Sequence, residues 1–229
     1  MTRQLTDGVW IIRLPQVNAY LVADDVLTLV DAGMPWDGPA IREAIEAAGF
    51  DAEAVERVLV THFDIDHVGG LQAFPAVEEI YVGQADAPFV TGEETPEFTD
   101  RKRGFQRVTE VVREPPPAPV KPVADGDVIG SFAAVHTPGH TPGHTVYVSE
   151  ERDVAFVGDL VTSDGASLSV PPWYLNQDTD QVRARIAALA ERLPPVDVIA
   201  PGHGEPLVSG AHRAIHALAE DAWDSGGNA

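Results

Sequence analysis

Short apolar runs, rich in Val and Ile and bounded by Gly, Pro or Asp, recur along this chain and predict β-strands. Apolar residues at helical spacing predict fewer helices, of which residues 179–193 have the clearest core-facing side. That side comprises Val182, Ile186, Leu189 and Leu193. Strands are expected at residues 9–14, 19–23, 26–30, 55–60, 79–82, 133–136, 145–148, 154–157 and 196–200, and helices at about 37–48, 179–193 and 210–223.

One stretch departs from this alternation. Residues 91–113 are polar and poorly periodic, with a short helix expected around 103–112, and a proline-rich segment at 114–119 follows them and should run extended. We interpret residues 91–122 as either a lid over a site or a tolerated insertion. No repeat or linker divides the sequence, so residues 1–229 are expected to form a single domain.

The composition restricts the class of protein and the chemistry available to it. A chain of 229 residues with 44% hydrophobic content can bury a sizeable core. No apolar run approaches the roughly 20 residues that cross a bilayer, and the first residues lack the apolar core of a secretion signal, so we expect no membrane association and a cytoplasmic location. Because the chain has no cysteine, any metal must be held by histidines and carboxylates.

The charge balance is strongly acidic, with 36 Asp and Glu against 15 Lys and Arg and a formal net charge of −21. Such a surface suits a cytoplasm of very high salt, which points to a halophilic source. The same charge makes nucleic acid an unfavourable partner, because affinity for phosphates rests on cationic contacts. The basic run at residues 101–103 is better explained as a solvated loop.

The segment at residues 61–70 contains the densest group of potential metal-binding side chains in the sequence. Four side chains that can bind a metal, His62, Asp64, Asp66 and His67, lie within six residues directly after an apolar strand-like run. Imidazoles and carboxylates so close together would crowd one another unless a cation lay between them. Metal sites accept both donor types, and this arrangement points to a metal-dependent hydrolase.

Three later motifs also place a histidine or an aspartate just after an expected strand. Pro-Gly turns follow residues 133–136 and present His140 and then His144. An apolar run ends in Gly158 and Asp159, and the last motif is Pro-Gly before His203. Six of the eight histidines of the chain lie in these four motifs, so chance clustering is the weaker explanation.

In this order the motifs resemble the signature of the metallo-β-lactamase-fold hydrolases: His-x-His-x-Asp-His, Thr-Pro-Gly-His, Gly-Asp and Pro-Gly-His. The resemblance implies an α/β protein, a four-layer αβ/βα sandwich of two mixed β-sheets flanked by helices, with the site at one edge. It implies that His62, Asp64 and His140 hold a first metal, that Asp66, His67 and His203 hold a second, and that Asp159 bridges the two. Asp31 would orient a ligand histidine by hydrogen bond.

Position 64 departs from the family, which usually has histidine where this chain has Asp64. The additional oxygen ligand makes the first site harder and more negative, which shifts its preference towards manganese or iron. We therefore expect one or two divalent ions, with zinc still preferred.

The resemblance implies that a metal-bound hydroxide attacks a small acyl substrate, a thioester or a lactone, and that Asp66 orients the hydroxide. The His136–His140–His144 spacing is similar to that of hydroxyacylglutathione hydrolases (the glyoxalase II-like thioesterases), which gives His144 a supporting or substrate-contacting role. Too few residues follow His203 for the helical domain with which those enzymes hold glutathione. Aromatic walls for the substrate are predicted at Trp36, Phe63, Trp173 and Tyr174.

Two other functions stay open. One is a phosphodiesterase or nuclease of the same superfamily, which the net charge disfavours. The other is a metal-bearing binding or redox module without hydrolysis. A β-lactamase fits less well than an acyl hydrolase, because the Asp66–His67 pair and Gly158–Asp159 look like the thioesterase type. The sequence does not determine the oligomeric state.

The acidic surface leads to a prediction about salt. We expect the free energy of unfolding to rise from dilute buffer to molar KCl, because the salt screens repulsion between carboxylates. Urea denaturation at a series of fixed KCl concentrations measures this dependence. Full stability in dilute buffer would contradict a halophilic source.

Overall fold

The computed structural model describes residues 2–95 and 115–224 of the chain. The predicted short helix at 103–112 and the basic run at 101–103 lie outside these ranges. Within them, no helix is both long enough and apolar enough to cross a membrane.

The first half of the chain forms a seven-stranded mixed sheet in the order β1-β2-β3-β4-β5-β6-β7. Its strands β1 to β4 pair antiparallel, whereas β4 to β7 pair parallel. The bounds are β1 Thr2–Thr6, β2 Val9–Arg13, β3 Asn18–Ala23, β4 Leu27–Val30, β5 Val55–Val60, β6 Glu79–Gly83 and β7 Val120–Val123.

The second half forms a five-stranded sheet in the order β14-β11-β10-β9-β8, and a small three-stranded sheet in the order β13-β12-β15. In the five-stranded sheet, β11 and β14 pair parallel and the other neighbours pair antiparallel. The bounds are β8 Val128–Ile129, β9 Phe132–His136, β10 Thr145–Ser149, β11 Val154–Gly158, β12 Thr162–Asp164, β13 Leu168–Ser169, β14 Val198–Pro201 and β15 Gly204–Glu205.

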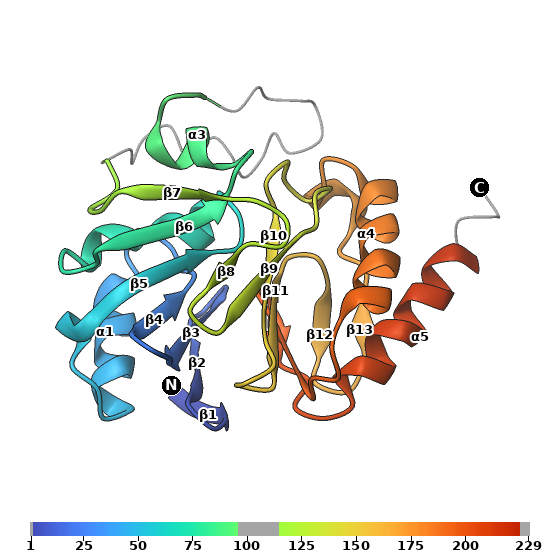
Figure 1. Ribbon diagram of the computed structural model, residues 1–229, viewed down its shortest axis with the longest axis horizontal. Coiled ribbons are helices and arrows are strands. Elements are labelled where there is room, and N and C mark those ends of the chain that lie inside the picture. The colour runs from blue at the N-terminus through green and yellow to red at the C-terminus, as the bar shows by residue number, and fades with distance from the viewer. Residues whose placement is uncertain (1, 96–114, 225–229) are drawn as a thin grey trace.

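Helices cover the outer faces of the two large sheets (Figure 1). Helix α1 (Gly38–Ala47) packs on the first sheet, and α4 (Thr179–Arg192) and α5 (Ala211–Asp224) lie against the second. The short helices are α2 (Ile65–Val68) and α3 (Ala87–Thr91), and the 3₁₀ turns are η1 (Ala52–Ala54), η2 (Leu71–Ala73) and η4 (Trp173–Leu175).

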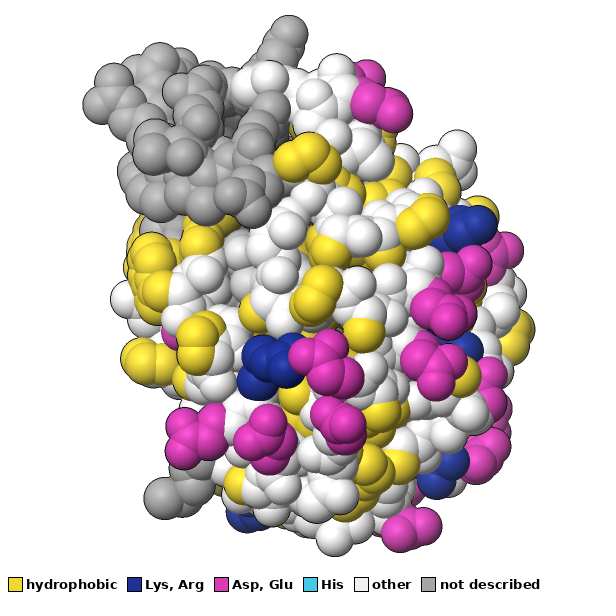
Figure 2. All heavy atoms as spheres, turned by 90° about the vertical axis from the view of Figure 1, so that its left-hand side faces the viewer, with side chains coloured by type: hydrophobic (Ala, Val, Ile, Leu, Met, Phe, Trp, Pro, Cys, Tyr) yellow, Lys and Arg dark blue, Asp and Glu magenta, His cyan; other side chains and the backbone are white. Residues whose placement is uncertain are grey.

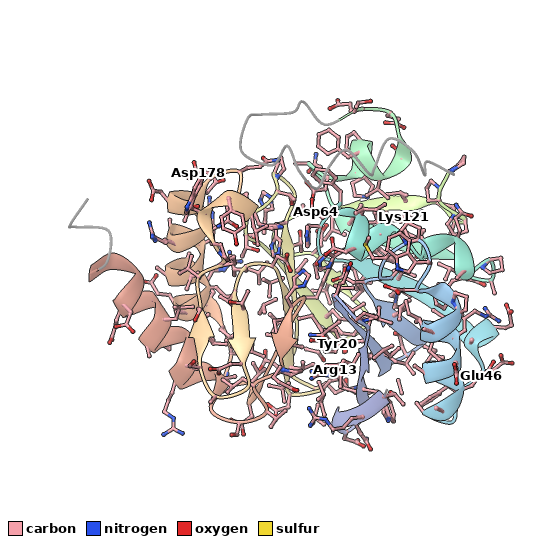
Figure 3. The ribbon with its side chains drawn as sticks, turned by 180° about the vertical axis from the view of Figure 1, so that it is seen from behind. Arg13, Tyr20, Glu46, Asp64, Lys121 and Asp178 are labelled. Carbon is pink, nitrogen blue, oxygen red and sulfur yellow. The ribbon has the colours of Figure 1, made fainter. Side chains whose placement is uncertain are left out.

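Three apolar clusters correspond to the three interfaces between layers. Ile41 and Leu29 belong to the cluster beneath α1, and Ile186 and Val157 to the cluster beneath α4. The third cluster lies between the sheets and includes Tyr20, which is labelled at that position in Figure 3. The predicted α/β sandwich of two mixed sheets flanked by helices is confirmed.

The predicted strands and helices fall within about two residues of the observed ones. The sequence analysis missed β1, whose residues are mostly polar, and β7, which contains a lysine and a proline. It also missed elements too short to give a periodic pattern, namely α2, α3, β8, β12, β13 and β15. The strands β1 and β7 are edge strands of the first sheet, where proline and polar residues are tolerated because one side of the backbone is not paired. Residues 120–122 therefore belong to the sheet. Whether the rest of 91–122 is a lid or an insertion stays a prediction.

Acidic side chains gather on the lower and right-hand parts of the face shown in Figure 2, where Lys, Arg and apolar side chains lie between them. The few arginines of this protein are often neutralised by a neighbouring carboxylate, as Arg42 is by Glu53 at 2.6 Å. The halophilic source stays a prediction.

Strand ends from both sheets meet at one edge of the sandwich. The backbone N–H of Thr145, at the start of β10, donates to the carbonyl of Thr61 after β5 at 2.8 Å. The N–H of Asn18 in β3 donates to the carbonyl of Gly202 after β14, also at 2.8 Å. Figure 3 shows Asp64 at this junction between the two halves of the molecule.

Candidate metal centre

The loop after β5 and the short helix α2 present four polar side chains at the junction. Asp64 has extended backbone angles and begins α2, whose single turn places Asp66 and His67 side by side. The helix packs tightly on the segment after β4, because a Cβ on Gly70 would lie only 2.0 Å from the carbonyl oxygen of Ala32. This close approach requires glycine and fixes the position of α2.

His62, Asp64 and His140 form a first group of potential ligands. The Nε2 atom of His140 lies 3.1 Å from Asp64 Oδ2, and the Nε2 atom of His62 lies 3.5 Å from the same oxygen. The two imidazoles are buried and come from different sheets, since His62 follows β5 and His140 precedes β10.

Asp66, His67 and His203 form a second group. Asp66 Oδ2 lies 3.3 Å from the Nε2 atom of His203 and 3.9 Å from that of His67. His203 follows β14 and is the more exposed of the two histidines, with about a third of its side chain open to solvent (32%). This opening gives solvent or a small molecule access to the group.

Asp159 lies between the two groups. Its Oδ1 atom is 3.6 Å from the Nε2 atom of His67, and its Oδ2 atom is 3.5 Å from that of His140 and 3.3 Å from that of His203. The structure thus brings together all seven residues predicted to bind metal. A third group of potential ligands, His62, His67 and Asp159, links the two groups that the sequence analysis proposed. A carboxylate in this position can share its two oxygens between two cations.

The four histidines of the two groups all turn Nε2 towards the centre, because Nδ1 is hydrogen-bonded elsewhere. The Nδ1 atom of His203 donates to the Gln16 carbonyl at 2.7 Å, and that of His140 donates to Asn176 Oδ1 at 3.0 Å. That of His62 faces Thr61 Oγ1 at 3.0 Å. Partners of this kind orient an imidazole and leave its other nitrogen with a lone pair for a metal.

Asp31 orients His67 through a hydrogen bond of the same kind. Its carboxylate accepts hydrogen bonds from the backbone N–H and the hydroxyl of Thr61 and from His67 Nδ1, each at 2.8 Å. Asp31 also has a φ of 57°, which non-glycine residues rarely adopt although Asp tolerates it. Such strain costs about 1–3 kcal/mol and persists only where the surroundings hold it in place.

His144 lies behind the centre and does not face it as a ligand. Its Nε2 atom accepts a hydrogen bond from the backbone N–H of Asp159 at 3.1 Å, and its Nδ1 atom is 2.8 Å from Thr137 Oγ1. Burial and neighbouring histidines hold the pKa of His144 well below its usual value, so the ring is neutral and its Nε2 can accept. His144 therefore supports the backbone of the residue predicted to bridge.

The electrostatics of the centre indicate a place for positive charge. Burial alone would lower the pKa of His203 and of His67, but the carboxylates of Asp159, Asp66 and Asp31 outweigh it and raise these pKa values to about 11 and about 9. By contrast, burial and the neighbouring His67 lower the pKa of His62 to about 4. The carboxylates thus favour positive charge at this centre, on protonated imidazoles or on a bound cation.

Several buried atoms at the centre lack a hydrogen-bond partner within the described part of the chain. They are His62 Nε2, His67 Nε2 and Asp159 Oδ1. Buried polar atoms are almost always paired, so three unpaired atoms facing one point call for a missing partner. Nitrogen and carboxylate donors grouped in this way fit a divalent cation.

The predicted aromatic walls divide into two kinds. Trp36, Trp173 and Tyr174 are exposed, by 62%, 65% and 53%. Phe63 is buried and its ring lies 4.8 Å from that of Phe89 in α3, so it packs inside the protein. Contact of these four residues with a substrate stays a prediction.

The sequence analysis missed two residues that organise the centre, Asn176 and Asp86. Asn176 is buried just before α4 and orients His140, and Asp86 is buried between the loops that carry the first group. The only local signal was a polar residue close to a helix start, which usually indicates a cap. Neither residue lies near a histidine in the sequence.

Comparison with known proteins places this centre in a family context. The family model described as the metallo-beta-lactamase superfamily matches residues 12–203. The chain is 26% identical over 255 residues to the probable metallo-hydrolase YqjP of Bacillus subtilis strain 168, covering 96% of this chain and 77% of that protein. It is 27% identical over 161 residues to the atrochrysone carboxyl ACP thioesterase nsrC of Aspergillus novofumigatus, covering 67% of this chain and 41% of that protein.

Solved structures show the same architecture. BJP-1, a subclass B3 metallo-beta-lactamase of Bradyrhizobium japonicum, aligns with a TM-score of 0.68 at 21% identity, covering 98% of this chain and 91% of that one. TTHA1623, crystallised in a di-iron-bound form, aligns with a TM-score of 0.63 at 28% identity, covering 85% of this chain and 91% of that one. The first likeness shows the fold alone.

The hydrogen bond between Asp31 and His67 leads to a prediction for the metal-free protein. Replacing Asp31→Asn should lower the pKa of His67 from about 9, because the carboxylate that favours the imidazolium is gone. Since the folded-state pKa of His67 is raised, its contribution to stability is complete below about pH 6.5 and is lost as the pH rises through about 9.

Imidazole NMR shifts followed against pH measure this change. The matched control is Asp24→Asn, which replaces a buried carboxylate paired with Arg57 at the opposite ends of the strands and should leave His67 unchanged. A His67 pKa that is the same in Asp31→Asn and in the unaltered protein would contradict the assignment.

Proposed function

The chain belongs to the metallo-beta-lactamase superfamily and is a metal-dependent hydrolase, and from this premise we propose that it cleaves a small acyl substrate, a thioester or a lactone, with two divalent ions in the centre. The observation that carries the proposal is the pair of three-residue groups that meet at Asp159, with buried donor atoms turned towards one point. His62, Asp64 and His140 would hold one ion, and Asp66, His67 and His203 the other.

Bound ions would supply Lewis acidity, lowering the pKa of a water and polarising the substrate carbonyl. The protein's own part is to hold and orient. The hydrogen bonds of Asp31 and Asn176 to His67 and His140 keep Nε2 of each ring aimed at the centre. Asp66 lies at the more open side beside His203, where its second oxygen can accept a hydrogen bond from the attacking water.

Two observations favour an acyl group over a phosphodiester. One relative of this chain is named as an acyl-carrier-protein thioesterase, so a related sequence cleaves a thioester in that protein. Among the described residues, Asp66 and Asp159 form ion pairs only with histidines. No described lysine or arginine pairs with these carboxylates, so none is placed beside them to bind a phosphate. A neutral acyl carbonyl suits this environment better than an anion.

The identity of the metal depends on Asp64. This carboxylate lies next to both histidines of the first group and adds a hard oxygen donor there. Zinc accepts such a set, but manganese and iron are favoured more than in an all-histidine group. The di-iron-bound relative is in line with iron as an occupant.

The activity can be tested with protein prepared at high salt. Metal analysis should give two ions per chain, and the loaded protein should turn over thioesters or lactones in a panel that also contains a phosphodiester and a β-lactam. His203→Ala should reduce kcat/KM by at least about a hundredfold, because it removes a ligand and frees Asp66 from its partner. The control His212→Ala alters an exposed histidine of α5 and should retain full activity.

Turnover of the phosphodiester alone would replace this proposal with the nuclease function. Metal binding without turnover of any member of the panel would favour a binding or redox module instead.

Asp64 generates a separate prediction about metal choice. Asp64→His should raise the affinity of the first group for zinc relative to manganese, because a softer nitrogen donor replaces a hard oxygen. Competition between the two metals, followed by elemental analysis of the protein, measures the ratio. An unchanged zinc-to-manganese ratio would show that Asp64 does not set the preference.

A further inference from the structure

Asp86 is a fully buried carboxylate that belongs to neither ligand group. It precedes α3, and every hydrogen bond that the structure gives its side chain runs to one of two neighbouring loops. Its Oδ2 atom accepts from the hydroxyl of Thr141 at 2.7 Å and from the backbone N–H of Phe63 at 3.2 Å. Its Oδ1 atom accepts from the backbone N–H of Gly143 at 2.6 Å.

Two of these three donors are direct sequence neighbours of proposed ligands, and the third, Gly143, lies in the same loop as His140. Phe63 lies between His62 and Asp64, and Thr141 directly follows His140. One carboxylate therefore joins the loop that carries two members of the first group to the loop that carries the third. The three hydrogen bonds of Asp86 connect only the loops of the first group, since residues 66, 67 and 203 are not adjacent to any of the donors.

The backbone around Asp86 is closely packed. A Cβ on Gly83, at the end of β6, would lie 1.8 Å from the carbonyl oxygen of Gly143. A Cβ on Gly143 would lie 2.3 Å from the backbone nitrogen of Asp86. On the other side, Phe89 of α3 lies against Phe63 with ring centroids 4.8 Å apart. The turn before α3 is thus in direct contact with both loops.

A neutral side chain of the same shape could not replace the carboxylate fully. Ionised aspartate only accepts hydrogen bonds, whereas asparagine must turn an NH₂ group towards some of the donors. The Thr141 hydroxyl can rotate to accept, but the backbone N–H of Phe63 cannot. Burial raises the pKa of Asp86 to about 6 in spite of these hydrogen bonds, so the site retains a charge that is costly to bury.

We propose that Asp86 is a positioning residue for the first metal: by tying the His62–Asp64 loop to the His140 loop, it sets the distance between these ligands and hence the affinity of the first group. This inference rests on the proposed function, because it requires metal to bind there. The other role for Asp86 is general stability of the fold, which would affect both groups alike.

The test separates the two groups with variants that each remove one ligand. In a His203→Ala background the first group is intact, and adding Asp86→Asn should weaken metal binding there by about 10–100-fold, as for other residues that orient ligands. In a His140→Ala background only the second group is intact, and adding Asp86→Asn should leave its affinity unchanged. Competition of Co²⁺ with a coloured chelator measures both affinities, and the visible absorption bands of bound Co²⁺ report its coordination.

Two further variants act as controls. Asp24→Asn removes a buried carboxylate far from the centre and should change neither affinity. Thr141→Val removes one donor to Asp86 and should weaken the first group in the same direction by a smaller factor, so the inference can be tested even if Asp86→Asn does not fold.

Equal losses of Co²⁺ affinity in the two backgrounds would overturn the inference. It would also be overturned if neither Asp86→Asn nor Thr141→Val lowered the Co²⁺ affinity in the His203→Ala background. Absence of Co²⁺ binding by the unaltered protein would instead refute the proposed function.

Discussion

The central constraint on this structure is negative charge buried at the junction of two sheets. Asp66 and Asp159 lie there with little exposure, and the groups opposite them are imidazoles. Carboxylates removed from water must be compensated by positive charge and hydrogen bonds, or they destabilise the fold. Protonated His67 and His203 can supply that charge, but only by giving up the lone pairs that a metal uses. Metal and proton therefore compete for the same atoms.

The fold meets this constraint by fixing the backbone around the centre. Hydrogen bonds between the sheets, such as that from Thr145 to Thr61, hold the strand ends together without help from a ligand. Gly202 passes so close that a Cβ would lie 2.3 Å from Asp159 Oδ1. The strained backbone of Asp31 belongs to the same arrangement, since its carboxylate holds Thr61 and His67. Contacts within the protein thus hold the side chains of the centre in fixed positions, as a site that binds or reacts with a small molecule requires.

The sequence predicted the convergence of these histidines and carboxylates because each lies in a short motif beside an apolar strand, and strand ends meet at sheet edges. The family resemblance supplied their division into two groups. The role of Asp31 as the partner of a histidine was predicted only through the family resemblance. Asn176 and Asp86 were missed because they act across the fold, 36 residues from His140 and 55 from Thr141. The contact of Phe63 with Phe89 of α3 was not predicted either, since 26 residues separate the two rings. Contacts between distant loops leave no periodic pattern in a sequence, so only coordinates show them.

The central claim is that strand ends from two sheets converge to bind two cations that share Asp159. Anomalous diffraction from crystals of the metal-loaded protein tests it most directly. The account predicts two peaks about 3.5–4 Å apart, one beside His62 and His140 and the other beside His67 and His203, with Asp159 between them. A metal-loaded crystal with no peak at this junction, or with its metal bound elsewhere on the acidic surface, would contradict it.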